Sequence, residues 1–98
     1  MTRPVVFRQI AYLELNRAVI WYEERRQGLG IEFLPAFKAS IAKIKERPES
    51  FPVEYRGFRK VLLDRFPYKI FFSIDHEKIS VVGVLHGSQR TTRLRGRN

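Results

Sequence analysis

Cysteine is absent from the 98-residue sequence, and histidine occurs only as His76 and His86. The absence of cysteine excludes disulfide bonds, thiolate metal sites and a cysteine nucleophile. Two histidines are too few for a histidine-rich metal site. We therefore expect neither a bound metal nor a cofactor.

Long apolar runs are also missing. No stretch of the sequence approaches the roughly 20 apolar residues that a membrane-spanning helix needs. The opening residues Met1–Val5 lack the apolar core of a signal peptide. These absences predict a cytoplasmic protein without a membrane partner.

Acidic residues are scarce relative to basic ones. Nineteen Lys and Arg residues stand against ten Asp and Glu residues, which gives a net charge of +9. A field of this size attracts nucleic acid, ribosomes or an acidic protein partner. The plainer alternative is a globular domain with a solvated basic face and a basic tail. A hydrophobic content of 44% indicates a packed chain, and the length predicts a single domain over residues 1–98.

The hydrophobic periodicity predicts an α+β fold. The expected elements, in chain order, are a strand over 5–7, helices over 10–26 and 31–46, a loop over 47–57, and strands over 58–63, 66–74 and 78–85. The two helices form a hairpin that packs on a mostly antiparallel sheet, in the order strand-helix-helix-strand-strand-strand. From about residue 90 the chain becomes polar and basic, and we expect a flexible tail there.

Several residues of the helical hairpin have predicted roles. Trp21 and Tyr22 are expected to pack on the core. Gly28-Leu29-Gly30 is interpreted as the turn between the helices, because it lacks the surroundings of a phosphate-binding loop. Glu23 and Glu24 are expected to pair with arginine or to face water. Pro35 implies either that the regular second helix starts nearer Phe33 or that the helix is kinked at the proline.

The apolar stripe of the second helix is expected at Phe33, Phe37, Ile41 and Ile44, with Leu34 beside it. Arg47-Pro48 is expected to end this helix, because the residue before proline avoids helical geometry.

This order of elements, with these residues, resembles the RelE/ParE toxin superfamily over roughly residues 5–92. The segments that carry the resemblance are Trp21-Tyr22-Glu23, Gly28-Leu29-Gly30, Phe33-Leu34, Pro48…Phe51-Pro52, Arg59-Lys60, Phe66-Pro67-Tyr68-Lys69-Ile70-Phe71 and Val82…Val84…His86…Arg90. The resemblance implies the toxin of a bacterial type II toxin–antitoxin module, held inactive by a cognate acidic antitoxin. It also implies that operator DNA is bound only through the antitoxin.

Two mechanisms occur in this superfamily. ParE-like members poison DNA gyrase by binding and need no catalytic residue, and the first two segments favour this branch. Other members are metal-independent endoribonucleases that cut messenger RNA on the ribosome. The candidate residues for such catalysis here are His86, Lys69, Arg90 and Tyr68, as acid, base or phosphate ligands.

The match to the ribonuclease branch is incomplete. An Arg-Leu-Val-Tyr run is common there, whereas this chain has Lys69-Ile70-Phe71-Phe72, and its last tyrosine is Tyr68. Lysine cannot make the planar, bidentate phosphate contact of arginine. The departures favour binding over catalysis. The residues expected to bind the target or the antitoxin are Arg59, Lys60, Lys69, Arg90 and Arg93.

Two further hypotheses stay open at this point. One is a non-catalytic basic nucleic-acid-binding module, although no base-stacking signature or recognition helix is evident in the sequence. The other is an inactive member of the superfamily. A neighbouring gene for an acidic antitoxin would favour the toxin over the first, and growth after induction of the chain would identify the second.

Overall fold

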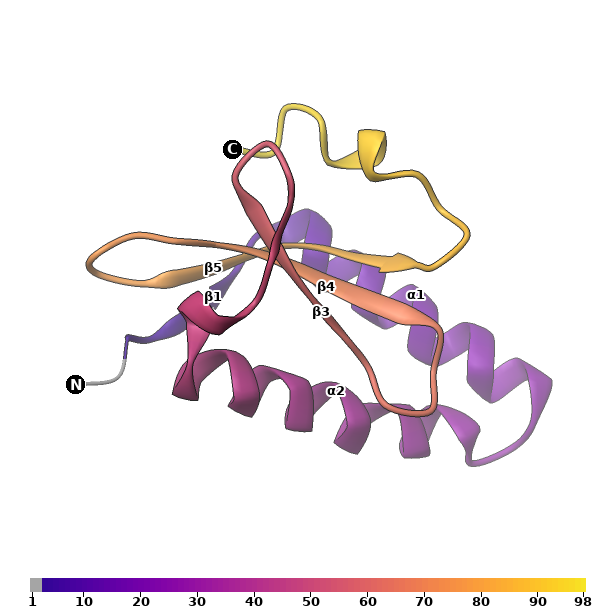
Figure 1. Cartoon of the computed structure of the whole chain (residues 1–98). Coiled ribbons are helices and arrows are strands. Elements are labelled where there is room, and N and C mark those ends of the chain that lie inside the picture. The colour runs from indigo at the N-terminus through magenta and orange to yellow at the C-terminus, as the bar shows by residue number, and fades with distance from the viewer. Residues whose placement is uncertain (1–2) are drawn as a thin grey trace.

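The chain folds as a helical hairpin on one face of a five-stranded sheet (Figure 1). The structure is a computed structural model that describes residues 3–98. The elements are β1 (Val5–Phe7), α1 (Gln9–Arg25), α2 (Leu29–Glu46), the 3-10 turn η1 (Pro48–Ser50), β2 (Val53–Tyr55), β3 (Phe58–Leu62), β4 (Tyr68–Ile74), β5 (Ile79–His86) and the 3-10 turn η2 (Thr91–Leu94).

The strand order of the sheet is β1-β5-β4-β3-β2. β1 pairs with β5 in parallel, and every other neighbouring pair is antiparallel. β1 and β2 lie at opposite edges of the sheet, and the two helices connect them. The predicted α+β class, with a helical hairpin on a mostly antiparallel sheet, is confirmed.

The turn between the helices is shorter than predicted. Gly28 adopts a left-handed φ of 88°, and α2 begins at the next residue. The Glu23 carboxylate accepts hydrogen bonds from the backbone N–H groups of Gly28 (2.9 Å) and Gly30 (3.0 Å), so it caps the start of α2. The expectation that Glu23 pairs with arginine or faces water is therefore wrong.

Gly30 belongs to the helix rather than to the turn, and it lets the two helices approach closely. A Cβ at Gly30 would lie 2.7 Å from the carbonyl oxygen of Val19 on α1. α2 then continues through Pro35 and ends at Glu46, immediately before Arg47-Pro48 as predicted. The alternative of a helix that starts nearer Phe33 is wrong, because α2 begins at Leu29.

β2 was not predicted, because the whole of 47–57 reads as loop in the sequence. This strand has only three residues and pairs with β3 through a tight turn at Arg56 and Gly57. Both turn residues have positive φ, 47° and 85°, as a two-residue hairpin requires. Arginine is not typical of that position, so the sequence carries only half of the usual signal.

The main core lies between the helices and the sheet. Its fully buried members include Phe33, Ile44, Ile70 and Phe72. The predicted stripe of α2 is confirmed, with Phe33, Phe37 and Ile44 buried and Ile41 packed beside them.

A second, smaller core lies on the other face of the sheet. Phe58, Phe71, Val82, Leu85 and Leu94 are its buried members. The C-terminal segment supplies Leu94 and lies across the sheet from α2 (Figure 1). Part of the segment from about residue 90, where a flexible tail is expected, packs on the sheet through Leu94.

Candidate functional site

The basic residues of the sheet divide between its two faces. Neighbouring residues of a strand point to opposite faces, so Arg59 and Lys60 are separated by the sheet. The Arg59 guanidinium donates to the carbonyl oxygens of Phe51 (2.6 Å) and Glu49 (3.1 Å), and thereby fixes the loop before β2. Arg59 therefore has a structural role and does not join the other cations of the sheet.

Lys60 and Lys69 share the face that the helices leave uncovered. Lys60 pairs in register with Phe71, and Lys69 lies opposite Leu62 and Leu85. The Nζ of Lys60 is 3.0 Å from the Glu54 carboxylate. The hydrogen bond from Lys60 lowers the pKa of Glu54, and the charge of Lys69 contributes. The two lysines form a cationic strip, and Glu54 on the neighbouring strand β2 neutralises part of its charge.

Tyr68 and His86 form a cross-strand pair at one end of the sheet. They are register partners on β4 and β5, and their rings meet edge to face with centroids 5.3 Å apart. Burial raises the pKa of the Tyr68 phenol, and the neighbouring Tyr22 adds to the shift. Tyr68 therefore stays protonated at neutral pH, which suits a hydrogen-bond donor and not a general base.

The tight turn that follows His86 fixes the orientation of its imidazole. The backbone N–H of Ser88 donates to Nδ1 (3.0 Å), and the Ser88 hydroxyl lies 2.8 Å from the same atom. Nδ1 is thus an acceptor, and in neutral imidazole the proton must be on Nε2. In this tautomer Nε2 is a donor, and the lone pair that a general base needs is already engaged.

Two adjoining hollows surround this pair, and we call them together the Trp21 cleft. Trp21, Tyr68 and Gln89 line both hollows. The first hollow, of about 150 Å³, is also lined by Glu14, Arg17, Ala18, Val84 and Arg93. The second, of about 340 Å³, is also lined by His86 and Ser88. The structure therefore brings together three of the predicted site residues, Tyr68, His86 and Arg93.

One expectation about this region is corrected. Trp21 is 46% exposed, because the buried face of α1 is occupied by Ala18 and Tyr22, so only Tyr22 packs as predicted. The guanidinium of Arg25 lies 4.0 Å from the centre of the Trp21 ring. The other two catalytic candidates, Lys69 and Arg90, do not line the cleft. Arg90 is exposed immediately before η2.

A buried ion pair beside the cleft was missed. The Arg97 guanidinium donates to both carboxylate oxygens of Glu14 (2.9 and 3.0 Å) and to the Val82 carbonyl (3.1 Å). Glu14 also accepts from the Val84 N–H (3.0 Å). The pair thus supplies hydrogen-bond partners to the backbone groups of Val82 and Val84, which lie beyond the part of β5 that pairs with β1. The available signal was that Glu14 falls between Ala11 and Ala18 on the predicted buried face of α1.

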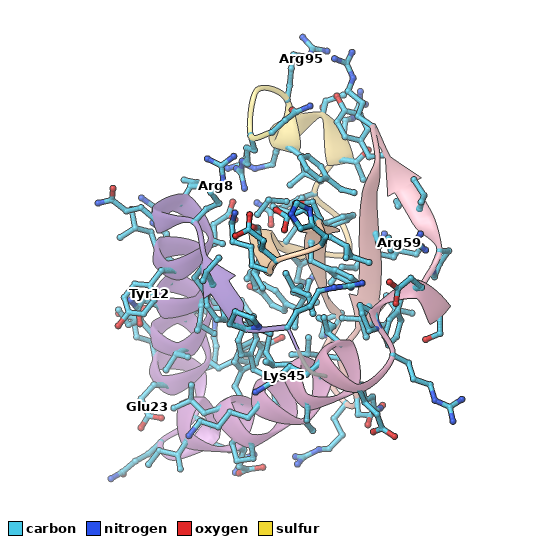
Figure 2. The ribbon with its side chains drawn as sticks, turned by 90° about the vertical axis from the view of Figure 1, so that its left-hand side faces the viewer. Arg8, Tyr12, Glu23, Lys45, Arg59 and Arg95 are labelled. Atoms are coloured by element: carbon cyan, nitrogen blue, oxygen red, sulfur yellow. The ribbon has the colours of Figure 1, made fainter. Side chains whose placement is uncertain are left out.

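An apolar groove on the opposite side of α1 is the second surface of interest. Its walls, around a volume of about 300 Å³, are Phe7, Tyr12, Leu15, Leu34, Phe37, Lys38 and Ile41. Tyr12 is 56% exposed on the outer side of α1 (Figure 2). Lys38 supplies the single charged side chain of the lining. A groove of this composition is suited to an apolar helix face.

Neither a metal centre nor a membrane span is found in the described part of the chain. Residues 3–98 contain no group of three or more His, Asp or Glu side chains placed to hold a metal ion. Over the same residues, neither helix is sufficiently long and apolar to cross a bilayer.

The fold is shared with a chain of known structure. A chain from the structure titled "Chromosomal ParDE TA system from P. aeruginosa" superposes with a TM-score of 0.76, covering 86% of this chain and 95% of that chain at 14% sequence identity. No family model matches the sequence, and no curated protein matches it. The predicted α+β fold is therefore shared with this solved chain.

Proposed function

We propose that this protein is the toxin of a bacterial type II toxin–antitoxin module. The observation that carries the proposal is the shared fold with a ParDE chain, which extends over 95% of that chain. The net charge of +9 and the apolar groove beside α1 agree with it, because a toxin of this kind is held by an acidic partner. The proposal places the protein in the cytoplasm, with operator DNA reached only through the antitoxin.

We propose that the antitoxin binds in the apolar groove. An amphipathic helix would place its apolar side chains between Tyr12 and Ile41, and acidic residues on its flank would meet Lys38. Tyr12→Glu should therefore weaken the complex with the acidic protein encoded beside this chain. Ile20→Glu is the matched control, because Ile20 lies on the same helix with the same exposed fraction of 56% but does not line the groove. Equal retention of the partner by both variants in co-purification would refute this seat.

Within the toxin proposal, we favour inhibition of DNA gyrase by binding over cleavage of messenger RNA. The geometry supports this preference, because Nδ1 of His86 is engaged by Ser88 and the Tyr68 phenol is protonated at neutral pH. Neither group is then a ready base for a ribose hydroxyl. Lys60, Lys69, Arg90 and Arg93 remain the proposed cations of the target surface.

Induction of the chain in growing cells tests this proposal. We expect growth arrest with DNA-damage signalling and intact messenger RNA, together with trapped DNA cleavage by purified gyrase. Lys60→Glu with Lys69→Glu should reduce both effects, whereas Lys45→Glu with Arg95→Glu should not. Rapid codon-phased cleavage of translated messages that is lost in His86→Ala would establish the ribonuclease instead. Continued growth after induction would refute the toxin and leave an inactive relative or a nucleic-acid-binding module.

A further inference from the structure

The Trp21 cleft contains two arginines that the fold does not use. Arg17 projects from α1 and Arg93 from η2, and both line the same hollow. Within residues 3–98, neither of them forms a salt bridge or a side-chain hydrogen bond, in contrast to Arg59 and Arg97. Two guanidinium groups from different elements therefore face one hollow with their donors free.

Glu14 is the one carboxylate among the described residues that line the cleft, and its charge does not repel an anion bound there. Glu14 accepts two hydrogen bonds from Arg97, at 2.9 and 3.0 Å, and a third from the Val84 N–H. The side chains of Glu14 and Arg97 are only 9% and 14% exposed, so the two charges compensate each other inside the protein. The net charge that the hollow presents is that of Arg17 and Arg93.

Other polar groups around the cleft are also donors. His86 presents the Nε2–H, since Nδ1 accepts from Ser88, and Tyr68 keeps its phenolic proton. The Gln89 side-chain oxygen accepts from the His86 N–H (2.7 Å), which leaves its amide hydrogens to donate. Two guanidiniums, an imidazole N–H, a phenol and an amide NH₂ together suit an anion with several acceptor oxygens, such as a phosphate.

Trp21 adds a planar surface to this set of donors. Trp21 is 46% exposed, and the Arg25 guanidinium lies over one face of its ring, 4.0 Å from the centre, so a ligand would stack on the opposite face. The Trp21 side chain borders both hollows, so a phosphate near Arg93 and a planar group against the indole would be close together. Exposed aromatic rings among arginines bind unpaired bases of a phosphodiester chain, whereas the bases of a duplex are already stacked.

We propose that the Trp21 cleft is a non-catalytic binding site for a single-stranded segment of nucleic acid. Arg17 and Arg93 bind the phosphates, His86 and Gln89 donate hydrogen bonds, and Trp21 stacks on a base. The site is distinct from the apolar groove and from the Lys60–Lys69 strip, shares only Arg93 with the proposed target surface, and does not depend on the toxin activity proposed above. Both DNA and RNA supply the required chemistry, because the donors address phosphate and the indole addresses any base.

The test measures binding of a fluorescent single strand to the purified chain by anisotropy. The probes are an oligothymidylate and an oligouridylate of about twelve nucleotides, titrated at several salt concentrations. Arg17→Gln with Arg93→Gln should weaken binding at least tenfold and lower the slope of log K against log salt by about 1.4, since each phosphate contact on a single strand contributes about 0.7. Trp21→Ala should weaken binding by roughly 5- to 150-fold through lost stacking.

The matched control removes the same number of cations elsewhere. Lys45→Gln with Arg95→Gln changes two exposed side chains outside the cleft, and Arg95 points away from the body of the protein (Figure 2). This control should bind within about twofold of the unmodified chain at moderate salt, where distant charges are screened. Each variant is first checked for an unchanged unfolding midpoint by circular dichroism.

Three results would overturn the proposal. One is a loss in the control equal to the loss in the cleft variant, which would assign the binding to net charge. Another is tighter binding of a duplex than of the single strands. The third is equal competition by an acidic peptide of the same length, which would make the cleft a general anion site. Growth assays play no part in this test, so its failure leaves the toxin proposal standing.

Discussion

The ion pair between Glu14 and Arg97 offers the sharpest test of how the C-terminal segment is held. Arg97→Ala removes two hydrogen bonds to the carboxylate and leaves Glu14 with the Val84 N–H as its one partner. Because the Glu14 side chain is only 9% exposed, its charge would be left nearly uncompensated. Removal of one partner from a buried pair typically costs about 3–5 kcal/mol.

Glu14→Gln should cost less than Arg97→Ala. The amide oxygen of glutamine can still accept from Val84, and the Arg97 guanidinium, 14% exposed, can turn toward water. We expect a loss of about 1–3 kcal/mol for this variant, as for a hydrogen bond to a charged group. The double variant should be more stable than the sum of the single losses implies, since no buried charge remains.

Urea unfolding at pH 7, followed by circular dichroism, measures all three variants. For a chain of about this length, a loss of 3 kcal/mol lowers the melting temperature by roughly 12 °C or more. Amide exchange adds a local readout, because the N–H groups of Arg95 and Arg97 donate to Thr92 and Leu94 and should lose protection in Arg97→Ala. Unfolding midpoints equal to that of the unmodified chain would show that the segment is not anchored by this pair.

Three further predictions concern the two cores and the aromatic pair. Gly83→Ala should destabilise the smaller core, because the added Cβ would lie 2.5 Å from Leu94 Cδ2, and in chemical unfolding Gly83→Ala combined with Leu94→Ala should cost less than the sum of the two single losses. Phe37→Ala should cost about 3–5 kcal/mol, since the ring is 3% exposed, and an unchanged urea midpoint would contradict its place in the core. The raised pKa of Tyr68 stabilises the fold below the ordinary tyrosine pKa of 10.0, and this contribution is lost as the pH rises through the folded value. Tyr68→Phe should therefore flatten the fall in stability above pH 10, measured by unfolding over a pH series.

The longer elements were predictable because their signal is local. The apolar stripe of α2 extends over about three turns, from Phe33 to Ile44, and β3 to β5 are rich in β-branched and aromatic residues, so both signals survive errors at single positions. The helix-to-helix turn was placed two residues too late, because Gly30 reads as a turn residue until its approach to Val19 is known. A glycine that permits helix packing and a glycine that permits a turn look the same in a sequence.

The smaller core could not be predicted, because its parts are distant in the chain. Leu94 is an isolated apolar residue among basic and polar neighbours, and nothing local distinguishes it from an exposed leucine. It is fully buried because Gly83 on β5 leaves room above the sheet and because Arg97 reaches Glu14 on α1. The burial of Leu94 therefore depends on the positions of Gly83, Glu14 and Arg97, which the local sequence around Leu94 does not give.

The arginines that are free to bind a ligand could not be identified from the sequence either. Composition gives an excess of positive charge, and from composition alone every arginine contributes equally to it. In the structure, Arg59 is engaged by two loop carbonyls and Arg97 by a buried carboxylate, whereas Arg17 and Arg93 line a hollow with their donors free. An arginine whose donors are already satisfied inside the fold has little left for a ligand, however strong the field of the whole chain. The sequence therefore predicted a basic binding protein, while the assignment of particular cations to binding depends on which of them the fold has already used.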